Sequence, residues 1–208
     1  LQKLSEKEIY IPTKKMENIN NAIIREAFTR HEQVWKETLE RILPQIIAGA
    51  ELLKKTFTEK KKLLVCGNGG SAADSQHFAA EWLVRYKKER GPLPAIALST
   101  DTSTLTAIGN DYSFEEIFKR QVQALGSEGD TLVAFTTSGS SKNIVQAIKE
   151  AKQKKMNVIV LTGEKGSHLT GTVDLVIAVP SVETARIQEM HELIYHSWCE
   201  HLDFFLSE

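Results

Sequence analysis

The chain has 208 residues, a formal net charge of -1 and 25% charged residues, a composition typical of a soluble globular protein. This nearly neutral balance gives no electrostatic basis for binding nucleic acid or a membrane surface, and no apolar run approaches the roughly 20 residues that span a bilayer. The length suffices for one sizeable domain with an appended helical segment.

The N-terminal quarter of the chain has a helical pattern rather than a targeting signal. It has no basic-then-apolar signal segment. Because it begins with Leu1, we expect that an initiator residue or short leader is missing. Apolar residues recur at helical spacing from Ile19 to Phe57, and Pro44 is expected to end or kink this run. We predict that residues 1–58 form a helical extension that packs on the core and on neighbouring subunits.

Strand and helix patterns alternate over residues 59–208, which we assign to one α/β domain. Short apolar runs, partly β-branched, predict buried strands at 62–66, 94–98, 131–135, 157–161 and 174–179. Helical patterns fill the intervals at 72–88, 114–125, 141–154 and 183–206. This alternation predicts a mostly parallel five-stranded sheet flanked by helices, with ligands bound at the carboxyl ends of the strands.

Cysteine usage indicates a reducing compartment. Cys66 ends a predicted buried strand, and Cys199 lies in a predicted amphipathic helix. The two do not form a close pair, which argues against a disulfide framework and against a thiolate zinc site. Both are expected to be small buried hydrophobes, and the chain is expected to be cytoplasmic.

A glycine-rich turn follows the first predicted strand. It runs from Cys66 to Ala72, where a helical pattern begins, so its backbone N–H groups gather at a helix N-terminus that suits an anion. The turn also matches the dinucleotide fingerprint G-x-G-x-x-A. The acidic residue near the end of the second strand, Asp101, lies well beyond the expected spacing of about 20 residues. We therefore favour a phosphate over a nicotinamide or flavin.

Two more loops carry polar residues at strand ends. The third predicted strand runs into Thr136–Ser141, where hydroxyls surround Gly139 at a helix start. Such a loop suits a reversibly bound sugar phosphate, and the alternative is a plain serine N-cap. Another loop is predicted at 108–112, where Asn110 and Asp111 would hold sugar hydroxyls or simply form a turn before a helix.

Two predicted helices carry residues suited to a divalent metal. His77 and Glu81 stand four apart and share a helix face, while Gln188 and His196 stand eight apart on the last helix. Nitrogen and oxygen donors of this kind bind zinc or another transition metal. A solvated salt bridge is the alternative for His77 and Glu81. His191 and His201 are competing helix histidines.

These motifs together closely resemble the phosphoheptose isomerases, the sedoheptulose 7-phosphate isomerases of the SIS (sugar isomerase) fold, which is flavodoxin-like. The resemblance runs from about Trp35 to the C-terminus, with the motifs in the family's order. It is carried by the segments Cys66–Ser71, His77–Glu81, Gly109–Asp111, Thr137–Gly139 and Arg186–Glu189. Each segment is weak by itself, and the combination is specific.

The resemblance implies an aldose–ketose isomerase that forms a homotetramer, with active sites between subunits and one zinc ion in each. The implied metal ligands are His77, Glu81, Gln188 and His196, with Glu81 as base and His196 as acid. The implied substrate-binding residues are Asn68, Gly69, Gly70, Ser71, Asn110, Asp111, Thr136, Thr137, Ser138, Ser141 and Gln188. Ser140 departs from the family's pattern, which often has Asn there, and this bears only on fine substrate fit.

Two alternatives stay open at this point. Proteins of the same fold that bind the bacterial replication initiator DnaA look similar, but they lack the residues that correspond to Glu81 and His196. This chain has both, which favours an enzyme. An isomerase of another phosphosugar, such as a hexose 6-phosphate, is the second alternative, because residues that measure sugar length cannot be identified from the pattern.

Overall fold

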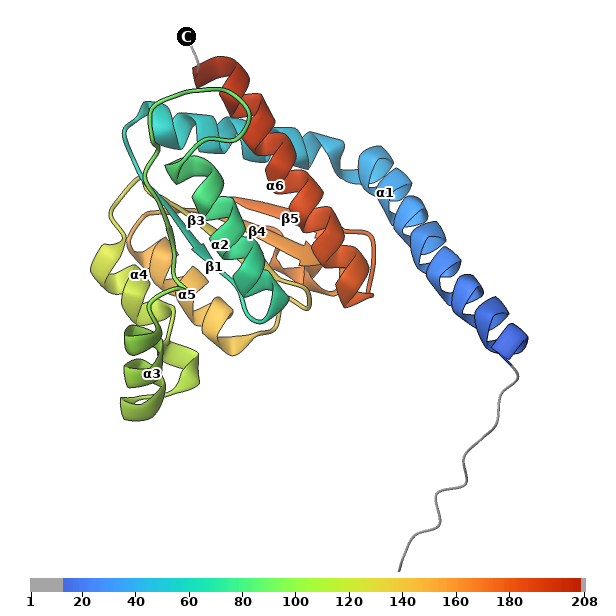
Figure 1. Ribbon diagram of the computed structural model, residues 1–208. Coiled ribbons are helices and arrows are strands. Elements are labelled where there is room, and N and C mark those ends of the chain that lie inside the picture. Colours follow the sequence, from blue (N-terminus) through green and yellow to red (C-terminus); the bar gives the residue numbers. More distant parts are fainter. Residues whose placement is uncertain (1–12, 207–208) are drawn as a thin grey trace, which may run out of the picture.

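A parallel sheet forms the centre of the molecule. The computed structural model describes residues 13–206, and the first part of the predicted extension, residues 1–12, lies outside them. The strands lie in the order β2-β1-β3-β4-β5, and every neighbouring pair is parallel (Figure 1). Their bounds are β1 Leu63–Cys66, β2 Ala95–Ala97, β3 Thr131–Thr136, β4 Asn157–Gly163 and β5 Leu175–Val179. The predicted five-stranded α/β fold is confirmed.

Helices cover both faces of this sheet. The α-helices are α1 Thr13–Thr58, α2 Gly70–Leu83, α3 Thr102–Asp111, α4 Lys119–Leu125, α5 Lys142–Gln153 and α6 Thr184–Leu206. Two 3₁₀ turns, η1 Phe114–Glu116 and η2 Glu164–Leu169, complete the connections. In the part of the chain that the structure describes, no helix combines the length and apolarity needed to cross a bilayer.

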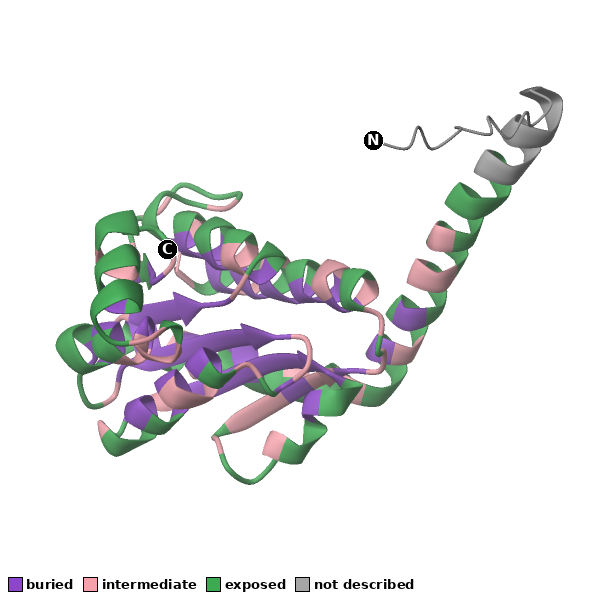
Figure 2. Ribbon diagram, turned by 90° about the horizontal axis from the view of Figure 1, so that it is seen from below, coloured by how far each residue is buried: buried purple, intermediate pink, exposed green. Residues whose placement is uncertain are grey.

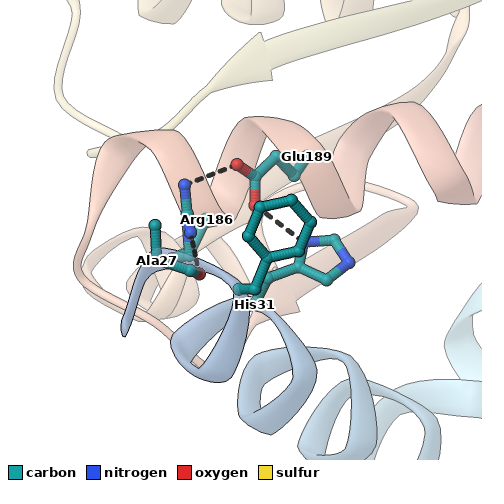
Figure 3. Close-up of a pocket in the computed structure, with 5 residues that line it drawn as sticks. Ala27, His31, Arg186 and Glu189 are labelled. Carbon is teal, nitrogen blue, oxygen red and sulfur yellow. Dashed lines mark hydrogen bonds and ion pairs between the residues drawn. The ribbon is translucent and has the colours of Figure 1, made fainter. Parts of the chain in front are cut away.

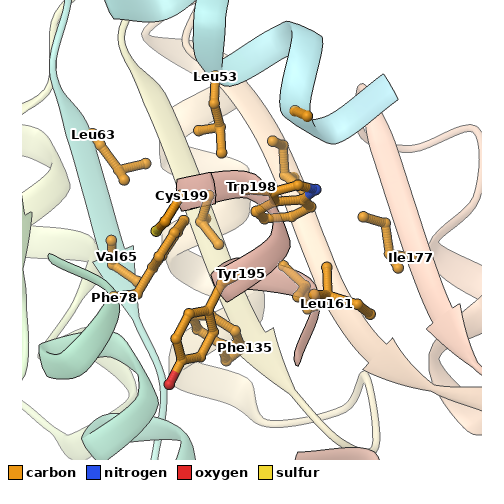
Figure 4. Close-up of a cluster of buried hydrophobic side chains, with 14 of the residues drawn as sticks. Leu53, Leu63, Val65, Phe78, Phe135, Leu161, Ile177, Tyr195, Trp198 and Cys199 are labelled. Carbon is orange, nitrogen blue, oxygen red and sulfur yellow. The ribbon is translucent and has the colours of Figure 1, made fainter. Parts of the chain in front are cut away.

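Alternate residues of the strands build two separate cores. Leu63 and Val65 of β1 point to the side of α1, α2 and α6, while Leu64 and Cys66 point to the side of α3, α4 and α5. Figure 4 shows the first core, in which Phe78 and Trp198 pack against the sheet, and Figure 2 shows the buried strands between the helical layers. Both sides of the sheet are therefore apolar, as the strand composition predicts.

The long helix α1 has two parts with different surroundings. Pro44 lies inside it, and the helix axis changes direction in the light-blue region that contains this residue (Figure 1). Proline lacks the N–H of the helical hydrogen bond and clashes with the preceding turn, so it kinks the helix, as predicted. Beyond the kink, Leu53 and Phe57 enter the core, whereas Ile24 and Phe28 before it are exposed.

Helix α3 was not predicted, and it corrects the predicted loop at 108–112. The Asp101 side chain accepts a hydrogen bond from the Thr104 N–H at 3.0 Å and caps a helix that ends at Asp111. The run Thr102–Thr106 is rich in β-branched threonine, which has low helix propensity, so the pattern gave no helical signal. Asn110 therefore stands on the last helical turn rather than in a loop. Its amide donates to the Asp111 carboxylate at 2.8 Å, and both side chains are exposed.

A buried histidine on α6 makes stability depend on pH. His191 is fully buried, its Nε2 lies 3.3 Å from the Thr162 carbonyl oxygen, and its Nδ1 has no hydrogen-bond partner. Burial lowers the pKa of His191 to about 4, against a weaker opposing effect of the Thr162 carbonyl. The unfolded chain, with an ordinary histidine pKa of 6.5, therefore binds more protons than the folded chain between about pH 6.5 and 4.

Stability is therefore expected to be complete above pH 6.5 and to fall as the pH is lowered toward 4. Between pH 7 and pH 5, His191 should remove roughly 2 kcal/mol of the free energy of unfolding. Urea unfolding at both pH values, in wild type and in His191→Gln, measures this contribution. The variant should lose less stability than wild type, and the exposed His168→Gln serves as the control. Equal losses in wild type and His191→Gln would refute the assignment.

Candidate functional site

Helices α2 and α6 run side by side in the same direction on one face of the sheet (Figure 1). Near the start of α2, the Gln188 amide nitrogen donates to Ser71 Oγ at 3.3 Å. Further along, the Tyr195 hydroxyl lies 3.0 Å from His77 Nδ1. Parallel packing thus brings together side chains that are more than 110 residues apart in sequence.

Three of the predicted site residues form one cluster between these helices. His77 Nε2 lies 3.1 Å from Glu81 Oε1 and 3.4 Å from His196 Nε2. One ligand atom from each residue lies within 4.8 Å of the other two. The pair on α2 meets because residues four apart are neighbours on a helix surface. Two imidazole nitrogens and a carboxylate oxygen make a donor set that fits zinc.

The surroundings of His196 favour its neutral, metal-binding form. Partial burial, followed by the charge of the neighbouring His77, lowers the pKa of His196. The ring of Tyr86 stacks on it, with centroids 5.5 Å apart and an interplanar angle of 25°. A neutral imidazole offers the lone pair that a metal ligand or a proton acceptor needs.

Gln188, the fourth predicted ligand, contacts the glycine-rich loop instead of the cluster. A Cβ atom on Gly70 would lie 2.7 Å from Gln188 Nε2, so the amide rests directly against this glycine. Gln188 lies eight residues before His196 on α6, about 12 Å along the helix axis. The structure thus unites three predicted ligands and places Gln188 with the predicted phosphate-binding residues.

The glycine-rich loop has the compact backbone that its sequence predicts. Gly69 has a φ of 57°, in the region where residues with a Cβ are strained, and it precedes α2. A Cβ on Gly67 would lie 2.3 Å from the Ser71 carbonyl oxygen, so only glycine fits there. The Ser71 side chain is itself buried and meets Gln188. The loop therefore brings its backbone close to the start of α2, where an anion is favoured.

The hydroxyl-rich loop Thr136–Ser141 follows β3, and β3 is the neighbour of β1, the strand that leads into the glycine-rich loop. Gly139 has a φ of 70°, and its N–H donates to Thr136 Oγ1 at 3.2 Å. Ser138 Oγ lies 2.9 Å from Ser140 Oγ, and the Thr137 carbonyl accepts the Gly163 N–H at 3.2 Å. Ser141 occupies the N-cap position of α5. Its side chain makes no capping hydrogen bond, so the plain N-cap alternative does not account for its hydroxyl.

Asn143, which the sequence analysis missed, joins the two loops. Its amide nitrogen donates to Asn68 Oδ1 at 2.8 Å, and Asn68 returns a hydrogen bond to Asn143 Oδ1 at 2.9 Å. Asn143 Oδ1 also accepts the Ile144 N–H at 2.9 Å, which fixes the orientation of the amide at the start of α5. Asn143 thereby holds a predicted substrate-binding residue in place. An asparagine in the first turn of a helix was the only sequence signal.

A buried ion pair ties the connection from α2 to β2 to both α2 and α6. Arg90 Nε lies 2.9 Å from Asp203 Oδ1, and both side chains are almost fully buried. The Arg90 guanidinium also donates to the Glu81 carbonyl at 2.7 Å and to the Trp82 carbonyl at 3.0 Å, at the end of α2. Burial alone would raise the pKa of Asp203, but hydrogen bonds from Lys88, Lys87 and Arg90 lower it overall. This pair holds the turn of α2 that carries Glu81.

Arg186 and Glu189, the two ends of the Arg186–Glu189 segment, line a surface pocket between α1 and α6, away from the cluster (Figure 3). The Arg186 guanidinium donates to the Ala27 carbonyl and to Glu189 Oε1. The other carboxylate oxygen of Glu189 lies 2.7 Å from His31 Nδ1. These two residues therefore hold the outer half of α1 against the start of α6.

Comparison with known proteins adds to this geometry. The profile of the SIS domain matches residues 28–163, well over half of the chain. Phosphoheptose isomerase of Shewanella loihica is 49% identical over 183 residues, which cover 86% of this chain and 93% of that protein.

Two solved structures are similar along nearly their whole length. The phosphoheptose isomerase GmhA of Neisseria gonorrhoeae has a TM-score of 0.83 and 42% identity, covering 88% of this chain and 98% of its own. A phosphoheptose isomerase of Francisella tularensis has a TM-score of 0.85 and 42% identity, covering 89% and 98%.

Proposed function

The chain belongs to the phosphoheptose isomerase family of SIS-domain proteins, and we propose that it converts sedoheptulose 7-phosphate to D-glycero-D-manno-heptose 7-phosphate. This aldose–ketose isomerisation supplies the first intermediate of nucleotide-activated heptose synthesis. The observation that carries the proposal is the convergence of His77, Glu81 and His196 between α2 and α6. The glycine-rich loop and the hydroxyl-rich loop lie at the carboxyl ends of the neighbouring strands β1 and β3, where parallel sheets of this kind bind ligands.

The reaction moves one proton between adjacent carbons through an enediol. A base removes a proton from C1 of the ketose while an acid protonates the C2 oxygen, which gives the enediol. The base then returns a proton to C2 and the C1 hydroxyl loses its proton to the group that acted as the acid, which gives the aldose. We assign Glu81 as the base and His196 as the acid. Glu81 Oε1 faces His77 at 3.1 Å, and we assign proton abstraction to the other oxygen, Oε2. Lowering the pKa of His196 makes its protonated form a stronger acid toward the C2 oxygen.

The proposed cofactor is one zinc ion in each site. His77, Glu81 and His196 would hold it, with Gln188 as the fourth ligand after its amide leaves Ser71. When bound, zinc polarises the carbonyl and hydroxyl oxygens of the sugar and stabilises the enediolate.

The glycine-rich loop and the hydroxyl-rich loop are the proposed binding sites for the phosphate group of the sugar. We propose that Asn68, Gly69, Gly70 and Ser71 bind it together with the hydroxyl-rich loop. The latter contributes Thr136, Thr137, Ser138 and Ser141. For Asn110 and Asp111, on the last turn of α3, we propose contacts with sugar hydroxyls.

We propose a homotetramer in which the extension formed by residues 1–58 packs against other subunits and the active sites lie between them. Large apolar side chains along α1 are exposed, including Phe28 at 73%, Ile23 at 59% and Leu39 at 47%. Two buried, unpaired cysteines, Cys66 and Cys199, support a cytoplasmic location.

The non-catalytic alternative, binding of the replication initiator DnaA, is disfavoured because Glu81 and His196 meet in one cluster with His77. The relatives that match most of the chain are also named as isomerases. The assay described next distinguishes a phosphoheptose isomerase from an isomerase of another phosphosugar.

A substrate assay with and without chelator tests the proposed function. The metal-loaded chain should isomerise sedoheptulose 7-phosphate far faster than fructose 6-phosphate, as followed by proton NMR of the aldose product. Chelation should remove the activity, and added Zn²⁺ should restore it. A preference for fructose 6-phosphate would show that the chain is an isomerase of another phosphosugar. Absence of turnover on both sugars would contradict the proposed isomerase activity.

A further inference from the structure

The two ring nitrogens of His77 face different partners. Nε2 points to the cluster, 3.1 Å from Glu81 Oε1 and 3.4 Å from His196 Nε2. Nδ1, on the other side of the ring, lies 3.0 Å from the Tyr195 hydroxyl. A neutral imidazole carries its proton on one nitrogen and a lone pair on the other, so the partner of Nδ1 decides what Nε2 offers.

Tyr195 is held rigidly at this position. Its side chain is fully buried, and its ring packs against Phe78 and Phe135 with centroids 5.1 and 6.1 Å apart. Figure 4 shows the ring inside the apolar cluster and the hydroxyl at its edge. A phenol hydroxyl is neutral near pH 7. A neutral hydroxyl accepts a hydrogen bond from an imidazole N–H.

Carboxylates lie near both ring nitrogens of His77. Glu81 Oε1, 3.1 Å from Nε2, favours a proton there while no cation is bound, and Glu192 favours a proton on Nδ1. Glu192 Oε1 lies 3.7 Å from this nitrogen, and a carboxylate stabilises a neighbouring N–H. With the proton on Nδ1, the lone pair of Nε2 points at two further acceptors, Glu81 and His196. Three lone-pair donors directed at one point repel one another unless a cation lies between them.

We propose that Tyr195 is a positioning residue, whose hydroxyl accepts the Nδ1–H of His77 and thereby directs the Nε2 lone pair into the metal-binding cluster. The inference rests on the metal site of the proposed function. Tyr195 directly precedes His196, so two consecutive residues of α6 contact the two sides of one histidine. Partners that orient a metal-binding histidine typically change metal affinity 10- to 100-fold.

The substitution Tyr195→Phe removes only the hydroxyl and keeps the buried ring. In the full chain, Zn²⁺ affinity, measured by competition with a fluorescent chelator, should fall about tenfold. The ¹⁵N shifts of His77 in the metal-free chain should show a larger share of the Nδ1–H tautomer in wild type than in the variant. The melting temperature should change little. Tyr112→Phe, an exposed tyrosine outside the cluster, is the matched control and should alter neither measurement.

The two readouts separate this inference from the proposed metal site. A wild-type chain that binds no Zn²⁺ would remove the metal site, and the tautomer of His77 would then decide the role of Tyr195. An unchanged tautomer with unchanged Zn²⁺ affinity in Tyr195→Phe would overturn the proposal. A tautomer that shifts in Glu192→Gln but not in Tyr195→Phe would overturn it as well, by assigning the role to the carboxylate.

Discussion

Replacing Glu81 by glutamine is expected to lower the turnover of sedoheptulose 7-phosphate by at least about a hundredfold, the typical contribution of a general base. The amide keeps the shape of the side chain but cannot accept the proton from C1. The Glu81 carbonyl remains held by Arg90 at 2.7 Å, so the backbone of α2 should be unchanged. The melting temperature and circular dichroism spectrum should therefore match wild type.

Two controls make this result specific to proton transfer. Glu89→Gln makes the same change on the neighbouring connection, where the side chain is 90% exposed, and should keep wild-type turnover. Zinc content must be measured in parallel, because Glu81 is also a proposed ligand and metal loss would lower the rate by another route. A Glu81→Gln enzyme that loads zinc and isomerises at the wild-type rate would disprove the base assignment.

Placing a charge on the exposed face of α1 is expected to dissociate the proposed homotetramer. Leu39 is 47% exposed and lines an apolar groove with Trp35 and Leu43 of α1 and Leu193 of α6. Burying an unpaired carboxylate in such a contact costs several kcal/mol, so Leu39→Glu should disrupt association. The residues by which α1 joins its own core, such as Leu53, are untouched, and the subunit should stay folded.

Sedimentation velocity measures this outcome. Wild type should sediment as four chains of 23.3 kDa each, and Leu39→Glu as a smaller species with reduced activity. Gln45→Glu adds the same charge at an exposed polar position of α1 and should stay tetrameric. Wild type that sediments as a single chain would contradict the proposed assembly, and an active, dissociated Leu39→Glu would contradict active sites that lie between subunits.

The sheet could be predicted from the sequence because each strand is a short apolar run between polar loops. All five predicted strands agree with the structure to within two residues at each end. Helix α3 could not be predicted, because its start depends on one Asp101 cap and its first turns are rich in threonine. Helix α1 continues through Pro44, since packing of its second half on the core outweighs the missing hydrogen bond.

The site was only partly accessible to sequence reasoning. Spacing alone placed His77 and Glu81 on one helix face, but their meeting with His196 depends on the packing of α2 against α6, which no local pattern encodes. The resemblance supplied that link. Tyr195, Asn143 and Arg90 were missed because their partners lie 75 to 118 residues away and become neighbours only in the folded chain.

The central claim is that Glu81 moves a proton between C1 and C2 of a bound ketose phosphate. Proton NMR of sedoheptulose 7-phosphate converted by the zinc-loaded enzyme in D₂O tests it most directly. We expect deuterium at C2 of the heptose 7-phosphate product, because an enediol takes its new proton from a base that exchanges with solvent. Product that forms with complete retention of the substrate hydrogen would indicate a hydride shift and contradict proton transfer by Glu81.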